Sequence, residues 1–80
     1  MGTMTNFRSN LMIIRRKRRM TQAALGKAIG TSGDVVGRYE RSDIIPSIEV
    51  VVKMADVLGV SVDYLVGRIS KASPNFSLII

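Results

Sequence analysis

The 80-residue chain contains no cysteine, no histidine and no tryptophan, and it has only two tyrosines and two phenylalanines. Without cysteine, the chain has no disulfide, no thiolate metal site and no cysteine nucleophile. Without histidine, it lacks the commonest general base and the commonest metal ligand. The six carboxylates are scattered along the chain. We therefore expect no enzyme, no catalytic residue, no metal site and no cofactor.

Long hydrophobic runs are also missing. The most apolar stretch, from Ile44 to Val52, is interrupted by Pro46 and Glu49, so it is too short for a membrane span. The N-terminal residues show no apolar stretch of the kind found in a signal peptide. We expect a cytoplasmic chain without a membrane partner, folded as one small domain with a marginal core.

Acidic residues are scarce in the first half of the chain. The formal net charge is +6, from 12 basic and six acidic residues. Residues 1–41 carry nine basic and two acidic residues, a net +7, whereas residues 42–80 carry three and four, a net −1. This distribution indicates a polyanionic partner that faces the first half.

Residues 21–40 organise the chain, and they predict two short helices joined by a tight turn. Gly30 can adopt a positive φ just past the first helix, and Ser32 is a good N-cap for the second. Two helices with such a turn form a helix-turn-helix, in which the second helix is the one expected to bind in a DNA major groove. The apolar residues that recur at helical spacing are Ala24, Leu25, Ala28, Ile29, Val36 and Tyr39.

A longer ordered set of residues extends this pattern: Thr21, Gln22, Leu25, Ile29, Gly30, Ser32, Val36, Arg38 and Glu40, then Pro46–Glu49, Ala55, Leu58–Ser61 and Asp63–Leu65. In order and spacing, the set resembles the phage repressor and Cro type of helix-turn-helix domain. The resemblance covers roughly residues 11–67. It implies an all-α, compact five-helix domain with a lambda-repressor-like fold that binds double-stranded DNA.

The chain is expected to divide into a frayed start at residues 1–5, a domain at residues 6–67 and a tail at residues 68–80. We expect Asn6 or Thr5 to cap a first helix that runs to about Arg19. Ser47 and Ser61 are expected to cap the fourth and fifth helices, and Gly59 and Gly67 to end them. The tail is apolar at its end, so packing onto its own domain, a dimer contact and disorder all stay open.

The basic run at residues 15–19 supports two interpretations. It is either a solvated helix end that matches the helix macrodipole, or a phosphate-facing patch that includes Arg16, Lys17 and Arg19. Arg15 lies one turn after Leu11, on the core side. The resemblance implies an ion pair between Arg15 and Glu40 that ties the first helix to the third.

Three further residues are expected on the phosphate side of the interface: Gln22, Ser32 and Arg41. The resemblance implies this role for Gln22, while a plain polar surface residue is the alternative. Gly26 stands where the resembled family usually has alanine. Glycine at this position permits a close approach of the third helix, at a cost of about 1 kcal/mol in helix propensity.

The outward face of the third helix is expected to hold the base-reading residues: Gly33, Asp34, Gly37 and Arg38. Only Arg38 offers a fork that can read guanine O6 and N7. Asp34 either accepts a bond from cytosine or simply favours the helix N-terminus. The two glycines either allow close backbone approach or signal weak base specificity.

These observations predict a sequence-specific transcriptional regulator, most simply a repressor, that binds operator DNA as a homodimer. One alternative is a protein-interaction module, such as an antitoxin-like protein with a protein partner and weak base readout. Another is a non-specific basic binder of RNA or of an anionic membrane surface. The isoleucines at 44 and 45 are expected either to cover the core or to form part of a dimer contact.

Overall fold

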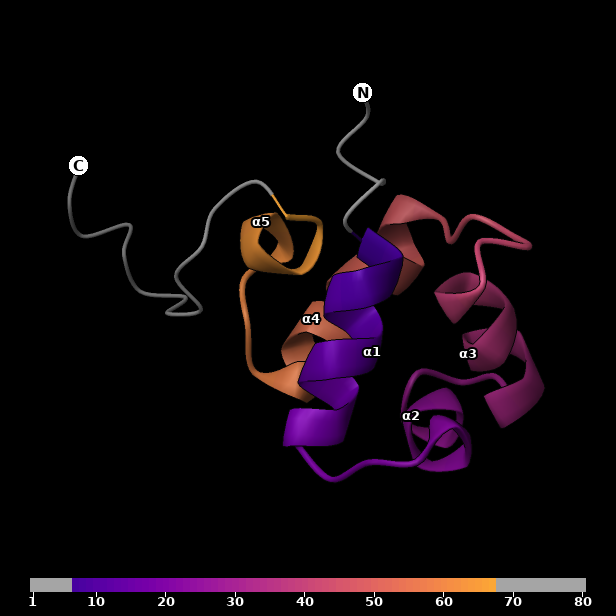
Figure 1. The fold of residues 1–80 in the computed structure, drawn as a ribbon. Helices are drawn as coiled ribbons and strands as arrows, with labels where there is room; N and C mark the ends of the chain where they lie inside the picture. The colour runs from indigo at the N-terminus through magenta and orange to yellow at the C-terminus, as the bar shows by residue number, and fades with distance from the viewer. Residues whose placement is uncertain (1–6, 68–80) are drawn as a thin grey trace, which may run out of the picture.

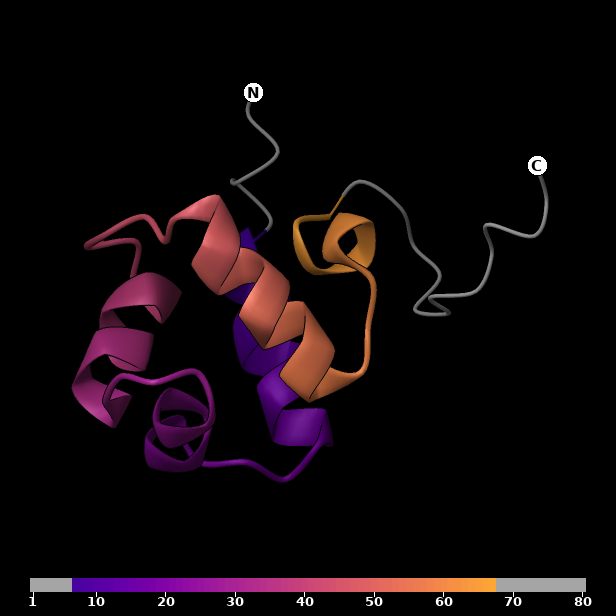
Figure 2. The ribbon, with the colours of Figure 1, turned by 180° about the vertical axis from the view of Figure 1, so that it is seen from behind.

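The structure, a computed structural model, describes residues 7–67, which form five α-helices and contain no strand. The helices are α1 (Phe7–Lys17), α2 (Gln22–Ala28), α3 (Gly33–Glu40), α4 (Ile48–Leu58) and α5 (Val62–Leu65). Helices α1 and α4 lie one behind the other at the centre, with α2 and α3 on one side and α5 on the other (Figures 1 and 2). The all-α class and the five-helix architecture predicted from the sequence are confirmed.

Four helices begin at the N-cap residues predicted from the sequence. In each case the side-chain hydroxyl accepts a hydrogen bond from the backbone N–H three residues later, at 2.9 to 3.3 Å. These bonds satisfy donors that a helix leaves unpaired at its start. The four caps are Thr21, Ser32, Ser47 and Ser61.

The first helix ends two residues earlier than predicted. It stops at Lys17, and Arg19 adopts a left-handed conformation with φ of 58°. The Met20 N–H donates to the Arg15 carbonyl at 3.1 Å, and the Arg19 N–H donates to the Arg16 carbonyl at 2.9 Å. These two bonds close the helix in a Schellman turn. The turn uses arginine where glycine is usual, so no glycine in the sequence marked this end.

The hydrophobic core lies between α1, α4 and the α2–α3 pair. The three apolar positions of α1 that share one face, Phe7, Leu11 and Ile14, are all buried there. Apolar side chains from the other four helices, and from Ile29 at the end of α2, complete the core. The helical ones include Leu25, Val36, Tyr39, Val51, Met54, Leu58 and Leu65. Every helix therefore contributes to a single core.

Helices α2 and α3 pack closely because glycine stands at their contact. A Cβ on Gly26 would lie only 2.3 Å from the carbonyl carbon of Ser32, which no side chain could tolerate. The Gly26 carbonyl also accepts a hydrogen bond from the Thr31 N–H at 2.7 Å, within the turn. The close approach expected from glycine at position 26 is confirmed.

Two side chains, Asn10 in α1 and Arg18 directly after α1, hold the C-terminal ends of the last two helices. Arg18 donates from Nε to the Leu58 carbonyl at 2.7 Å, at the end of α4. Asn10 donates from Nδ2 to the carbonyls of Tyr64 and Leu65, at 3.1 and 3.3 Å. The last carbonyls of a helix have no N–H partner within the helix, although the Gly67 N–H also donates to the Tyr64 carbonyl at 3.1 Å. The bonds from Asn10 and Arg18 therefore fix α4 and α5 against α1. The sequence analysis did not identify either contact.

Candidate nucleic-acid interface

A buried ion pair joins α1 to the end of α3. Arg15 donates to Glu40 through Nε at 2.6 Å and through Nη2 at 3.1 Å, so the pair is bidentate. Only 9% of the Arg15 side chain and 5% of the Glu40 side chain are exposed. The structure thus contains the pair that the resemblance implied, in the geometry that is strongest for arginine and carboxylate.

The same carboxylate also holds Gln22, the first residue of α2. Gln22 donates from Nε2 to Glu40 Oε1 at 3.0 Å, and its side chain is partly buried. Arg15 uses its remaining nitrogen, Nη1, to donate to the Met20 carbonyl at 2.9 Å. One network therefore links α1, the chain leading into α2, and α3. Among residues 7–67, every buried side-chain N or O atom, those of this network included, has a hydrogen-bond partner.

The two glycines of α3 do not lie on the outward face, and that part of the sequence prediction was wrong. Gly37 is buried, because the side chains of Gln22 and Arg41 lie over it. Gly33 is half-buried, and a Cβ there would lie 2.8 Å from the Ala23 nitrogen in α2. The helical period of α3 predicts the direction in which each side chain points. It does not predict which side chains of other segments cover that position.

Asp34 and Arg38 are the two side chains of the predicted base-reading set that face solvent. Arg38 Nε lies 3.2 Å from Asp34 Oδ2, one helical turn away, and the side chains are 52% and 70% exposed. An exposed pair of this kind contributes little to stability, about 0.3–0.5 kcal/mol. The ion pair between Asp34 and Arg38 can therefore be broken at little cost, and either side chain can then bind a partner outside the protein.

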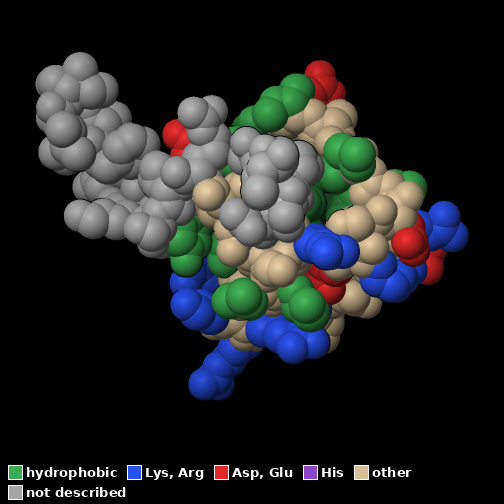
Figure 3. Space-filling view, turned by 45° about the horizontal axis from the view of Figure 1, so that its top comes forward, with side chains coloured by type: hydrophobic (Ala, Val, Ile, Leu, Met, Phe, Trp, Pro, Cys, Tyr) green, Lys and Arg blue, Asp and Glu red, His purple; other side chains and the backbone are tan. Residues whose placement is uncertain are grey.

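Five of the residues predicted to contact phosphates are exposed: three cations at the end of α1, and Ser32 and Arg41 at the two ends of α3. The cations at the end of α1, Arg16, Lys17 and Arg19, are exposed. Ser32 is exposed, but its Oγ already accepts the cap bond from the Val35 N–H. Arg41 is exposed and donates from Nε to Asp43 Oδ2 at 3.1 Å. In Figure 3, Lys and Arg side chains gather along the lower and right-hand edges of the face in view.

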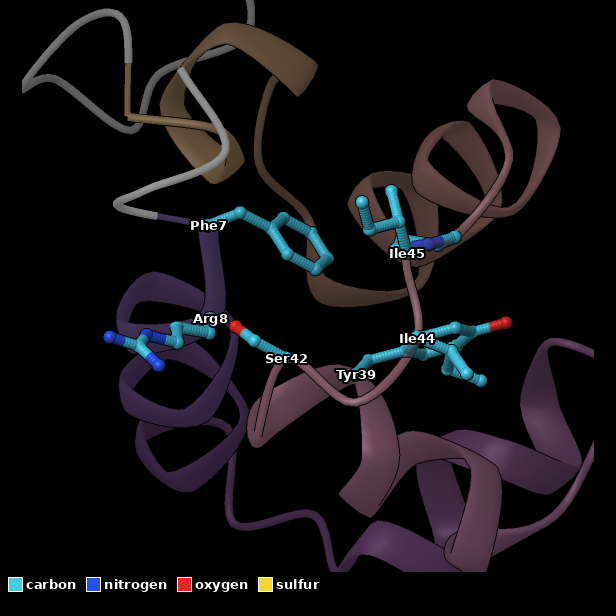
Figure 4. Close-up of a pocket in the computed structure, with 7 residues that line it drawn as sticks. Phe7, Arg8, Tyr39, Ser42, Ile44 and Ile45 are labelled. Carbon is cyan, nitrogen blue, oxygen red and sulfur yellow. The ribbon is translucent and has the colours of Figure 1, made fainter. Parts of the chain in front are cut away.

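A groove opens on another part of the surface, between the start of α1 and the loop after α3 (Figure 4). Its apolar walls come from Phe7, Tyr39, Ile44, Ile45 and Pro46. Ile45 is 77% exposed, so it does not cover the core. Ile48 and Val52 continue an exposed apolar row along α4 from this loop, with Ile48 68% exposed.

The predicted frayed start and the predicted tail at residues 68–80 lie outside the described residues. Within residues 7–67, no three His, Cys, Asp or Glu side chains gather closely enough to hold a metal ion. No helix in the same range has both the length and the apolar character needed to cross a membrane.

The fold and the capped turn between α2 and α3 define a helix-turn-helix domain. The sequence profile of the helix-turn-helix family matches residues 11–65. The chain belongs to this family.

Two curated relatives share the domain. The chain is 42% identical over 48 residues to the cryptic phage CTXphi transcriptional repressor RstR of Vibrio cholerae, a match that covers 60% of this chain and 43% of the relative. It is 40% identical over 45 residues to the uncharacterised HTH-type transcriptional regulator YazB of Bacillus subtilis, covering 56% of this chain and 65% of the relative. The matched region therefore spans less than two thirds of the length of either relative.

A solved structure extends the similarity to three dimensions. The P22 c2 repressor, crystallised in complex with a synthetic operator, matches with a TM-score of 0.70 and 34% sequence identity. The match covers 74% of this chain and 89% of the repressor chain. The arrangement of the helices in this chain is thus similar to that in an operator-bound repressor.

Proposed function

We propose that the chain is a sequence-specific transcriptional repressor that binds operator DNA as a homodimer, with α3 in the major groove. The observation that carries the proposal is the exposed face of α3 with Asp34 and Arg38, on a helix-turn-helix held beside the basic end of α1. The similarity to RstR and to the P22 c2 protein supports it, since both are repressors. Regulation then follows from occupancy of the operator and requires no chemical step.

In this proposal Arg38 breaks its ion pair with Asp34 and donates hydrogen bonds to guanine O6 and N7. This is the commonest specific contact of arginine with a base. Asp34 is then free to accept a hydrogen bond from a cytosine amino group. In this proposal Gly33 allows α3 to pack against α2, and Gly37, which lies beneath the side chains of Gln22 and Arg41, does not contact bases. The phosphate contacts that position the helix come from Arg16, Lys17, Arg19, Gln22, Ser32 and Arg41.

Arg38→Ala tests the proposal. The substitution should cost about 1–3 kcal/mol of binding free energy on the operator and relax the preference at one base pair in each half-site. Arg38→Lys should keep part of the non-specific affinity but lose the bidentate fork. The operator is first selected from a random DNA pool, and binding is then measured on operator and scrambled duplexes in parallel.

Lys27→Ala is the control, because Lys27 is an exposed cation on α2, outside the predicted contact set. Its effect should be smaller on both duplexes. An equal loss of affinity on the two duplexes for Arg38→Ala would contradict direct readout by Arg38. Failure to select any preferred sequence with the wild-type chain would contradict sequence-specific binding altogether.

The proposed homodimer needs a contact between two copies, because two half-sites are read together. The exposed apolar row of Ile45, Ile48 and Val52 is the surface we assign to that contact. Ile48→Ser should weaken dimerisation in sedimentation measurements and leave the melting temperature of the monomer unchanged, since Ile48 is 68% exposed. A dimerisation constant that is unchanged by Ile48→Ser, but weakened by truncation after Arg68, would assign the contact to the tail.

A protein-interaction module is a second candidate function, and the apolar groove beside Ile44 and Ile45 favours it. An antitoxin-like chain of this kind would bind a protein partner through the groove and read bases weakly. Capture of a stable partner, together with the absence of a selected DNA sequence, would support this candidate over the repressor.

A further inference from the structure

The groove between the start of α1 and the loop after α3 combines buried and exposed apolar side chains. Phe7 and Tyr39 are 3% and 8% exposed, whereas Ile44 and Ile45 are 38% and 77% exposed. The Phe7 ring points toward the loop, and the guanidinium of Arg8, the single charged residue among the described ones that line the groove, points away from it (Figure 4). The groove has a volume of about 350 Å³, and ligand pockets begin at about 300 Å³. It therefore suits a short, uncharged apolar segment.

The chain itself contains a segment of matching chemistry. Residues 76–80, with the sequence Phe-Ser-Leu-Ile-Ile, hold four apolar side chains and no charge. They lie outside the described residues. Residues 68–75, which connect the described residues to this apolar tail segment, include Arg68, Lys71 and Pro74 and have no apolar run. Apolar segments of about five to seven residues without charge promote aggregation when they are exposed. Docking of the segment in an apolar groove would remove both surfaces from water, which is favourable.

The apolar tail segment is close enough to reach the groove of its own chain. Asn10 donates to the carbonyls of Tyr64 and Leu65 at 3.1 and 3.3 Å, so the end of α5 lies beside the first turns of α1. Phe7, which lines the groove, precedes Asn10 by three residues, or about 4.5 Å along the helix axis. A path from α5 to the groove must cross α1, which is about 10–12 Å wide with its side chains. The connecting residues 68–75 span up to about 26–29 Å when extended, which is more than this path requires.

We propose that residues 76–80 dock in the groove of the same chain, against Phe7 and Ile44. Attachment within one chain favours this occupant, because a short flexible linker gives the segment an effective concentration in the millimolar range. At micromolar protein concentrations, docking in the same chain therefore prevails over docking in a second copy. Ile48 and Val52 do not line the groove, so they stay accessible for the dimer contact. The inference goes beyond the proposed repressor function and does not depend on DNA binding.

A spin label beside the apolar tail segment tests the docking by NMR. The chain has no cysteine, so Asn75→Cys carries the label at a single position in the full chain. The label should strongly broaden the amide signals of Phe7, Tyr39, Ile44 and Ile45, and chemical reduction of the label should restore them. Dilution of the isotope-labelled, spin-labelled chain into an excess of unlabelled wild type should leave the broadening unchanged, because both sites belong to one chain.

Substitutions inside and outside the groove separate docking from mere proximity. Ile44→Ser should reverse most of the broadening, because the docked segment would then bury a hydroxyl in an apolar environment. Leu78→Ser/Ile79→Ser in the tail should reverse it in the same way. Val57→Ser is the matched control, because Val57 in α4 is also 38% exposed but does not line the groove. This control should leave the broadening unchanged.

Melting temperatures give a second readout of the same contact. Ile44→Ser should lower the melting temperature less in the Leu78→Ser/Ile79→Ser background than in the wild type, because the segment that it releases no longer docks there. Val57→Ser should lower the melting temperature by the same amount in both backgrounds.

Four results would overturn the inference. Broadening that disappears on dilution would assign the groove to the tail of a second copy. Broadening that survives Ile44→Ser, or additive changes in melting temperature, would mean that the segment does not dock in the groove. The absence of any broadening would leave the groove to a partner protein. None of these measurements uses DNA, so each of these results leaves the proposed repressor function untouched.

Discussion

Replacing Glu40 by alanine should destabilise the domain by about 3–5 kcal/mol, because the change leaves the Arg15 guanidinium buried without its partner. It also removes the acceptor of Gln22. The expected stability of an 80-residue chain is only about 4–12 kcal/mol. The Glu40→Ala chain should therefore lose a large part of its stability and unfold at a clearly lower denaturant concentration than the wild type at 25 °C.

A double-mutant cycle with Arg15→Ala isolates the contribution of the pair. The coupling energy should fall within about 0.5–3 kcal/mol, as for residues in one buried network. The exposed pair of Asp34 and Arg38 is the matched control, and its cycle should give about 0.3–0.5 kcal/mol. Arg15→Gln and Glu40→Gln replace the alanine variants if those do not fold. Additive effects at Arg15 and Glu40 would mean that the two side chains do not stabilise each other.

Raising the salt concentration should weaken operator binding by a larger factor than any single substitution. If roughly six to ten phosphates are neutralised per dimer, affinity should fall about 10³–10⁵-fold between about 50 and 200 mM salt. Each neutralised phosphate releases condensed counterions, and added salt opposes that release. The measurement is a binding titration of the same operator duplex at several salt concentrations.

Variants at the basic end of α1 provide the control for the salt experiment. Arg16→Ala and Lys17→Ala should each reduce the salt slope by about one per half-site. Lys53→Ala, an exposed cation on α4, should leave the slope unchanged. A flat salt response of the wild-type chain would contradict a nucleic acid as the main partner. An equal change of slope for Lys53→Ala would show that only the total charge matters.

Local sequence signals predicted most helix boundaries in this fold. Thr21, Ser32, Ser47 and Ser61 could be assigned as N-caps because a hydroxyl at that position bonds a backbone N–H only three residues away. The end of α1 could not be assigned in this way. Arg19 adopts the left-handed conformation that is usual for glycine, and the basic residues before it continue a helical pattern.

Contacts between distant segments were harder to predict. The bonds of Arg18 to Leu58 and of Asn10 to α5 join residues at least 40 positions apart, and a backbone carbonyl has no signature in sequence. Gly37 was expected on an outward face because the helical period gives only the direction of a Cβ. Whether a long side chain such as that of Gln22 lies over position 37 depends on where α2 packs. The helical period of α3 gives no information about the position of α2.

The bonds that Asn10 in α1 and Arg18 directly after α1 make to the ends of α5 and α4 limit how small a functional fragment of this chain can be. A peptide limited to α2 and α3 would keep the turn but lose Arg15, and Glu40 would have no cationic partner. A fragment that started at α2 would also leave the last carbonyls of α4 and α5 without Arg18 and Asn10. Transplanting this helix-turn-helix into another scaffold therefore requires α1 to move with it, as an inseparable part of the module.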